Sequence, residues 1–177
     1  MKTAIALLFL FILQQVAGQG VIQVSSAGIG EIKINMTLEQ VEKITGQTIS
    51  LKKNSEENYA MDTAVVTYKG VQVTIEFLET TEGENNKPVR KVYGLEASHP
   101  SLKTRSGIEL GSDKFEIVKK LDGMYLELQP HWRYDGKPDK KKYSLLRLTD
   151  GDNGTELLMF FEDNKLTGFK ISVYEGC

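Results

Sequence analysis

A segment that reads as a strand followed by a short helix occurs twice in this chain, 76 residues apart. In the first copy, residues 32–35 alternate in polarity and lead into a helical pattern over residues 36–46; the second copy covers residues 108–111 and 112–123. Thr37 with Gln40, and Asp113 with Glu116, have the spacing of a helix N-cap and its reciprocal partner. The repetition predicts two short amphipathic helices, each preceded by a strand.

Three strand-like segments follow each predicted helix. They are residues 64–68, 71–78 and 90–97 in the first half, and residues 143–148, 156–161 and 166–174 in the second. Lys69-Gly70 has the composition of a tight hairpin turn, and residues 150–154 and 163–165 form turns in the second half. On residues 73–77, alternation turns Glu76 outward while its apolar neighbours face a core.

These patterns predict an α+β fold of two tandem repeats, each a short helix packed on a three- to four-stranded antiparallel sheet. We expect the first repeat over residues 19–104 and the second over residues 105–177. A concave groove between two such repeats is a natural place for a ligand.

The beginning of the chain has the pattern of a secretory signal peptide. Residues 4–13 are an apolar run of about ten residues, the length of a signal-peptide core, whereas a membrane-spanning helix needs roughly twenty. Small residues at Val16 and Gly18 predict cleavage before Gln19. We therefore expect residues 1–18 to be removed and the protein to be secreted or periplasmic, with no membrane span.

Cysteine usage and charge exclude several classes. The one cysteine, Cys177, cannot form an internal disulfide and does not follow the apolar run, where a lipid-accepting cysteine would stand. Removing Lys2 leaves 21 basic against 24 acidic residues, a formal charge of -3. Nucleic-acid binding calls for a strongly basic surface, so we predict no nucleic-acid partner.

Residues 35–46 resemble the signature of the small exported bacterial domains typified by the beta-lactamase inhibitory protein and by the outer-membrane assembly lipoproteins of the SmpA/OmlA type. That signature is an apolar strand, Gly-Met-Thr, a Gln-Val pair and a glycine that ends the helix. In the first copy the matching residues are Met36, Thr37, Gln40, Val41 and Gly46, while Asn35 stands in place of the first glycine. In the second copy Gly111 matches, Asp113 replaces the threonine, and Glu116-Ile117 replaces Gln-Val.

The resemblance implies a tandem helix-on-sheet architecture and relatives that bind other proteins. The inhibitory protein carries disulfides and the assembly lipoproteins carry an acylated cysteine. This chain has neither feature, so neither named activity is carried over.

The sequence offers no recognisable catalytic or metal-binding constellation. Neither His99 nor His131 has further ligands at metal-site spacing, and no Gly-x-Ser-x-Gly motif is present. The segment that begins at Asp150 departs from a calcium loop after its third position, and we interpret it as a hairpin turn. We predict no catalytic residues, no metal and no cofactor.

Residues 130–143 are the most unusual segment, because they hold the only tryptophan among basic and aromatic residues. Such residues are enriched in protein interfaces. The candidate binding residues are His131, Trp132, Arg133, Tyr134, Lys140 and Tyr143. The alternative is a solvated loop whose Trp132 packs back onto the sheet.

The function we predict is an exported, non-catalytic binding module, inhibitor-like or an envelope accessory, that binds a protein through the groove between the repeats or through residues 130–143. Two alternatives remain open: an envelope hydrolase that uses carboxylates such as Glu76 or Glu96, and a passive structural surface protein.

Overall fold

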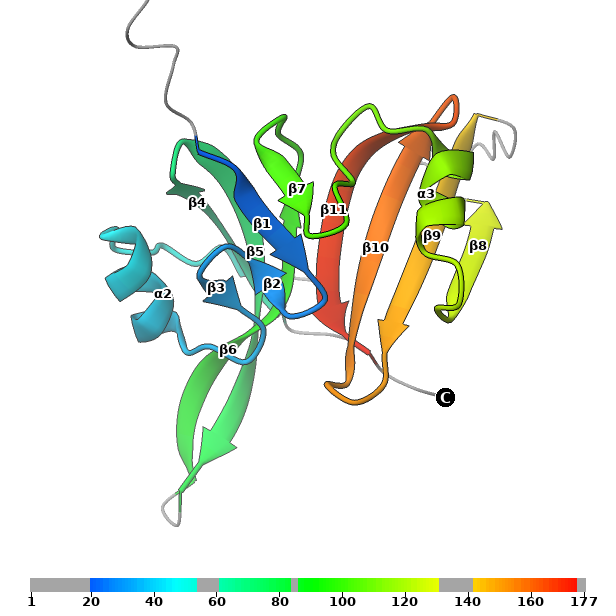
Figure 1. Ribbon diagram of the computed structural model, residues 1–177. Coiled ribbons are helices and arrows are strands. Elements are labelled where there is room, and N and C mark those ends of the chain that lie inside the picture. Colours follow the sequence, from blue (N-terminus) through cyan, green and yellow to red (C-terminus); the bar gives the residue numbers. More distant parts are fainter. Residues whose placement is uncertain (1–19, 54–60, 84–85, 131–141, 175–177) are drawn as a thin grey trace, which may run out of the picture.

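The computed structural model describes residues 20–53, 61–83, 86–130 and 142–174, which form an α+β fold (Figure 1). Two short helices accompany one sheet of four strands and one of seven. The helices are α2 (Leu38–Thr45) and α3 (Lys114–Lys120), and the strands are β1 (Ile22–Ser25), β2 (Gly28–Ile29), β3 (Ile32–Lys33), β4 (Met61–Tyr68), β5 (Val71–Glu82), β6 (Lys87–Ala97), β7 (Leu102–Thr104), β8 (Leu126–Pro130), β9 (Tyr143–Asp150), β10 (Thr155–Glu162) and β11 (Lys165–Val173).

The seven strands of the large sheet run in the order β4-β5-β6-β11-β10-β9-β8, and every pair is antiparallel. Strands β4 to β6 of the first half and β8 to β11 of the second half are therefore joined side by side at β6 and β11. At this seam Ala97 lies opposite Phe169 and Gly94 opposite Ser172. The predicted pair of separate sheets is thus one continuous sheet.

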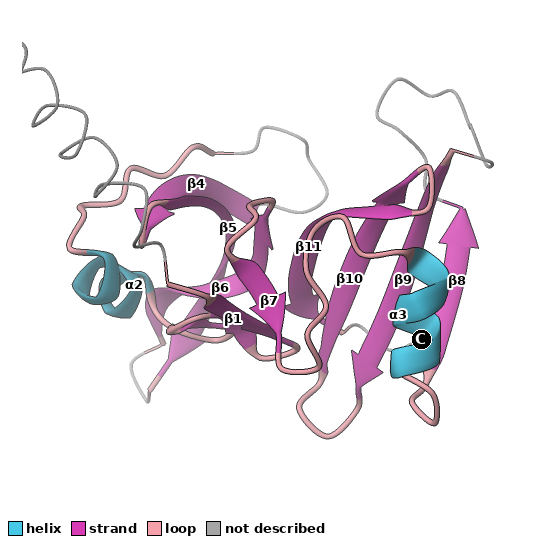
Figure 2. Cartoon of the chain, turned by 45° about the horizontal axis from the view of Figure 1, so that its top comes forward, coloured by secondary structure: helices cyan, strands magenta, loops and turns pink. Residues whose placement is uncertain are grey.

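The four-stranded sheet lies over one face of the large sheet (Figure 1). Its order is β3-β2-β1-β7, with β1 and β7 parallel. Ile29, Ile32 and Leu102 from this small sheet join Ile75 and Phe169 from the large sheet in one buried cluster. The core therefore lies between the two sheets, and Figure 2 shows the helices at the two ends of this layer.

Both predicted N-cap residues are confirmed, and α2 also forms the reciprocal bond of a capping box. The Thr37 hydroxyl accepts from the Gln40 N–H, and the Gln40 side chain accepts from the Thr37 N–H, at 3.3 and 2.8 Å. Gly46 ends α2 in the left-handed conformation, as expected of a glycine cap. Asp113 caps α3 through the Phe115 N–H at 2.9 Å, although this helix ends at Leu121 rather than at the predicted Gly123.

The two helix starts are attached to the large sheet by matching hydrogen bonds. Asn35 N–H donates to the Val92 carbonyl at 2.9 Å, and Val92 N–H donates to the Met36 carbonyl at 2.8 Å. In the second half, Gly111 N–H donates to the Leu166 carbonyl at 2.8 Å, and Leu166 N–H donates back to the Ser112 carbonyl at 3.0 Å. Asn35 and Gly111 both have positive φ, 67° and 84°. This conformation explains why only asparagine and glycine stand at this position.

The predicted strands of both three-strand groups are confirmed, most of them with longer bounds. The strand predicted at residues 108–111 is wrong, because only an isolated bridge between Lys103 and Glu109 forms there. A strand at that position would need a neighbour, and the backbone instead turns toward α3 at Gly111. Strands β1, β2, β7 and β8 were not predicted.

Candidate functional site: an apolar groove beside helix α3

An apolar groove of about 460 Å³ opens between the small sheet and α3, on the face of the large sheet that carries the core. We call it the apolar groove. Its lining combines both halves of the chain: Val24, Ser25, Ser26, Thr104, Arg105, Ser106, Ile108, Lys120, Leu121, Asp122, Met124, Leu148, Leu157 and Met159.

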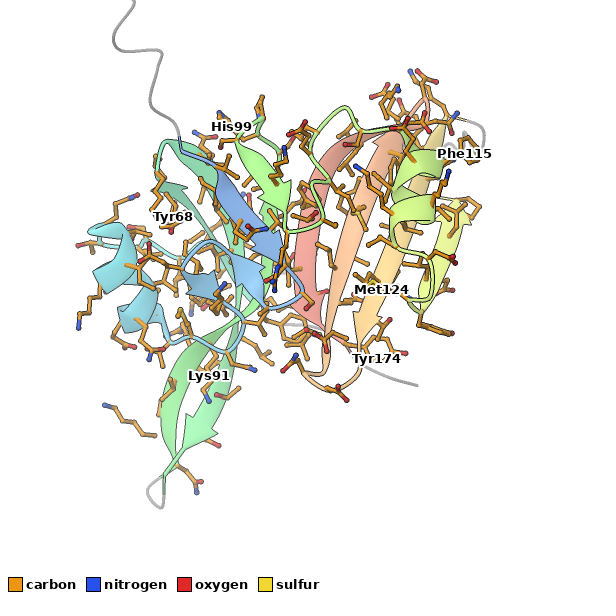
Figure 3. The ribbon with its side chains drawn as sticks, in the orientation of Figure 1. Tyr68, Lys91, His99, Phe115, Met124 and Tyr174 are labelled. Atoms are coloured by element: carbon orange, nitrogen blue, oxygen red, sulfur yellow. The ribbon has the colours of Figure 1, made fainter. Side chains whose placement is uncertain are left out.

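The apolar groove has an apolar floor. Leu157 and Met159 of β10 are buried, and the partly buried Leu148 of β9 lies beside them. Met124, in the turn after α3, is 56% exposed although it lines the groove. Figure 3 shows Met124 at the end of α3 away from Phe115. A thioether side chain in that position can adapt its shape to what enters.

Polar and charged groups surround the opening. Ser25, Ser26 and Ser106 supply hydroxyl groups. Arg105 and Lys120 supply cations and Asp122 supplies one carboxylate, so the lining carries a net charge of +1. Neither cation forms an ion pair with another residue in the part of the chain that the structure describes. The opening is therefore suited to hydrogen bonding and to a negative charge, while the floor is suited to an apolar group.

At one end of the groove a hydrogen bond links the two halves of the chain. Ser26 donates from its hydroxyl to an Asp150 carboxylate oxygen at 2.7 Å, and Asn153 donates to the same carboxylate from its side-chain amide at 2.9 Å. The hydrogen bonds from Asn153 and Ser26 hold the pKa of Asp150 below its usual value. The predicted hairpin turn at residues 150–154 is confirmed.

A shallower depression of about 370 Å³ continues from the same end and shares Ser26, Met124 and Leu148 with the groove. It adds Tyr125, which is one of the most exposed large side chains of the described residues. The two depressions meet at Met124, so an occupant of the groove can extend past this residue.

The opposite face of the large sheet is polar. Lys170 of β11 donates to Glu76 of β5 at 2.7 Å, across β6. Glu76 lies over Gly94, where a side chain would collide with its carboxylate. The sequence prediction that Glu76 points away from the core is confirmed, because Val73, Ile75 and Phe77 are fully buried.

A second ion-paired group lies on the same polar face. Arg147 of β9 lies 3.1 Å from Glu127 of β8 and 3.0 Å from Glu156 of β10, although its Nε–H is not aligned with Glu156 as a hydrogen bond. Glu76 and Glu156 both line a depression of about 350 Å³, and each has a cation within 3.0 Å. Glu96, the other acid of the hydrolase alternative, is exposed and does not line it.

Most of the sequence-predicted binding residues lie outside the described residues, namely His131, Trp132, Arg133, Tyr134 and Lys140. Cys177 lies outside them as well. Tyr143 starts β9, and its hydroxyl donates to Glu162 at 3.2 Å. The binding role of this segment stays a prediction.

His99 has a local structural role. Its Nδ1 accepts from the Ser101 N–H at 3.2 Å and lies 2.9 Å from the Ser101 hydroxyl, which closes the turn before β7. Over residues 20–53, 61–83, 86–130 and 142–174, no three His, Cys, Asp or Glu side chains come together as a metal site. None of the described helices has the length and apolarity to cross a membrane.

Comparisons with known proteins give structural similarity at a low level only. No family model matches the chain, and no curated protein matches its sequence. Among solved structures, the crystal structure of a putative beta-lactamase inhibitor protein from Streptococcus mutans is 12% identical, with 89% of this chain and 93% of that chain covered and a TM-score of 0.30. A TM-score of 0.30 does not define a common fold, so family membership stays a prediction.

Proposed function

We propose that this chain is an exported, non-catalytic binding module that holds an apolar segment of a partner protein in the apolar groove. The observation that carries the proposal is the groove itself: about 460 Å³, with an apolar floor, a flexible methionine at its mouth and walls from both halves of the chain. Its volume lies within the range of roughly 300–1,000 Å³ that binding pockets occupy.

The surroundings of the groove favour a particular kind of segment. An apolar side chain would bury itself against Leu157 and Met159, and the serine hydroxyls would bond the backbone beside it. Arg105 and Lys120 favour a carboxylate next to the apolar anchor. The occupant we propose is therefore an exposed loop or chain end that carries a large apolar residue flanked by Asp or Glu.

The tandem-repeat interpretation belongs to the same proposal. It is supported by the equivalent hydrogen bonds at Asn35 and Gly111 and by their shared positive φ. With the boundaries 19–104 and 105–177, the apolar groove takes one wall from the first repeat and the other from the second. Residues 1–18 act as the signal peptide, and the mature chain is secreted or periplasmic.

The segment over residues 130–143 is a second proposed contact surface. It connects β8 to β9, since Pro130 lies opposite Ser144 in their ladder. Its Trp132 and Arg133 would add interface contacts to those of the groove.

The test is affinity capture with the mature chain, from Gln19 onward, against the secreted and envelope fractions of its own host. The wild type is compared with Met124→Asp, and with Val65→Asp as the matched control, because Val65 is 63% exposed at the far end of the sheet. We expect a partner that Val65→Asp retains and that Met124→Asp binds at least tenfold more weakly, since a charge would enter the apolar groove. Equal capture by both variants would refute the groove as the binding site.

The double variant Trp132→Ala/Arg133→Ala separates the two surfaces. If this double variant loses the partner while Met124→Asp binds it fully, the partner binds residues 130–143 and not the apolar groove.

A further inference from the structure

We propose that this chain pairs with a second copy of itself through strand β8, so that the seven-stranded sheet continues from one copy into the other. The inference begins with the two edges of that sheet, β4 and β8, which the fold treats differently.

The β4 edge is covered by the chain itself. Lys52 and Thr63 exchange two backbone hydrogen bonds of 2.8 and 2.9 Å. Farther along the strand, the Gln47 side-chain amide donates to the Thr67 carbonyl and accepts from the Thr67 N–H. These contacts occupy backbone groups that an added strand would need.

The β8 edge is open within the part of the chain that the structure describes. Lys142, just before β9, accepts from the Asp163 N–H on the β10 side. Backbone groups alternate in direction along an antiparallel strand, so Leu145 and Arg147 of β9 point to β8, where they face Gln129 and Glu127. The backbone groups of residues 126, 128 and 130 are therefore left on the outer edge. Pro130 fits this position because it has no N–H to lose.

Exposed apolar side chains gather next to this edge. Of the eight large hydrophobic residues that are exposed in the described chain, five belong to α3, the turn after it and β8. They are Phe115, Val118, Met124, Tyr125 and Leu128, which we call the α3–β8 patch. Figures 1 and 2 both show α3 lying against β9 and β8 at this end of the sheet. A concentration of exposed apolar side chains beside an unpaired strand marks an interaction surface.

The sequence of β8 is complementary to itself. In an antiparallel pair centred on Leu128, Leu128 lies opposite its own copy and Glu127 lies opposite Gln129 of the second copy. Leu128 exchanges both backbone hydrogen bonds with its copy, and Leu126 N–H donates to the Pro130 carbonyl of the second copy. Every position on the strand therefore meets a compatible neighbour.

The charge on Glu127 disfavours one of the neighbouring registers. If the centre moved by one residue to Glu127, two carboxylates would lie directly opposite each other, which is destabilising. In the register centred on Leu128 the two Glu127 carboxylates do not lie opposite each other. Each Glu127 keeps its ion pair with Arg147 of its own copy.

The test is sedimentation velocity of the mature chain over a range of concentrations, in the presence of a reductant so that Cys177 cannot link two chains. We expect a monomer–dimer equilibrium. Leu128→Pro removes an outward N–H without touching the ladder to β9, and we expect at least a tenfold weaker dimer. The matched control is Val65→Lys, which places a charge on an exposed apolar residue of the other edge strand and leaves the dimer unchanged.

Two substitutions at one position test the register. Gln129→Glu places a carboxylate opposite Glu127 of the second copy and weakens the dimer, whereas Gln129→Lys places a cation there and strengthens it. A chain that stays monomeric at all concentrations overturns the proposal. So does a dimer that is insensitive to Leu128→Pro, or one whose affinity does not change in opposite directions in the two Gln129 variants.

This proposal and the binding function share one residue, Met124, which belongs to the α3–β8 patch and also lines the apolar groove. Leu128 and Gln129 do not line the apolar groove, so their variants test the dimer without altering the proposed partner site.

Discussion

Substituting Gly94 by alanine tests how the two halves of the sheet are held at their seam. A Cβ atom on Gly94 would lie 2.3 Å from the Glu76 carboxylate oxygen Oε2. No Cβ atom can approach that closely, so the Glu76 side chain must move. Moving it breaks the 2.7 Å ion pair with Lys170, which connects β5 to β11 across β6.

The magnitude follows from two opposing terms. The ion pair is partly exposed, with side-chain exposures of 23% for Lys170 and 26% for Glu76, so its loss costs about 1 kcal/mol. Replacing glycine by alanine in a compatible strand conformation stabilises by about 0.4–1 kcal/mol through the unfolded chain. In the wild-type background Gly94→Ala should therefore change the free energy of unfolding by less than about 0.6 kcal/mol.

The same substitution should be stabilising once Glu76 is shortened. In a Glu76→Ala background there is no carboxylate to displace, so Gly94→Ala should raise the free energy of unfolding by about 0.4–1 kcal/mol. The two sites should then show a coupling energy of about 1 kcal/mol. Urea unfolding of the wild type, both single variants and the double variant measures this coupling. Additivity of the two substitutions within about 0.3 kcal/mol would refute the account of Glu76 lying over Gly94.

Three further predictions concern the helices and the acidic residues. Asn35→Ala should lower the free energy of unfolding, measured in urea, by about 1–2 kcal/mol because residue 35 has a positive φ, whereas Asn35→Gly should leave it unchanged. Equal losses in the two variants would contradict the equivalence of Asn35 and Gly111. Ile117→Ala should cost about 2–5 kcal/mol, because Ile117 is the buried residue of α3; a loss below about 1 kcal/mol would mean that α3 does not pack on the sheet. The pKa of Asp113 is lowered chiefly by the Phe115 N–H and that of Asp150 by Asn153 and Ser26. A carboxylate whose pKa is lower in the folded state than in the unfolded state stabilises the fold above the unfolded-state pKa of about 3.9. This stabilisation is lost as the pH falls through the folded-state pKa. The Tm should therefore be level from about pH 5 to 7 and fall below about pH 4. Asp150→Asn should reduce this acid dependence in thermal unfolding, and an unchanged profile would contradict the role of that carboxylate.

The local features of the fold could be predicted from the sequence. Helix caps depend on residues three positions apart, so Thr37 and Asp113 identify the two helix starts without knowledge of the rest of the chain. The turn at Lys69-Gly70 is equally local, and both residues have the positive φ that a tight hairpin requires.

The arrangement of the strands could not be predicted in the same way. Alternation tells which face of a strand is buried, but not which strand lies beside it. The seam between β6 and β11 pairs residues such as Leu95 and Ile171, which are far apart in the chain. The short strands β2 and β7 are below the length at which a periodic pattern can be recognised.

The residues that line the apolar groove could not be predicted from the sequence. A groove between the halves follows from the duplication, but its lining comes from five separate parts of the chain. Met124 was missed. The signal that could have identified it is an apolar residue directly after Gly123, which is unusual in a turn. Residues 131–141 lie outside the described chain, so the prediction made for them remains a prediction.

The methionine methyl groups give the most direct test of the proposed binding site. After removal of residues 1–18 the chain retains Met36, Met61, Met124 and Met159. Met124 and Met159 line the apolar groove, Met61 lines the polar depression on the opposite face, and Met36 directly precedes Thr37, the N-cap of α2.

The measurement is methyl-methionine NMR during titration with 1-anilinonaphthalene-8-sulfonate, an apolar ring system with one negative charge. The account predicts saturable shifts of the Met124 and Met159 signals while those of Met36 and Met61 stay in place. Shifts confined to Met61, or no saturable shift of Met124 and Met159, would contradict the proposal that the apolar groove binds an apolar group.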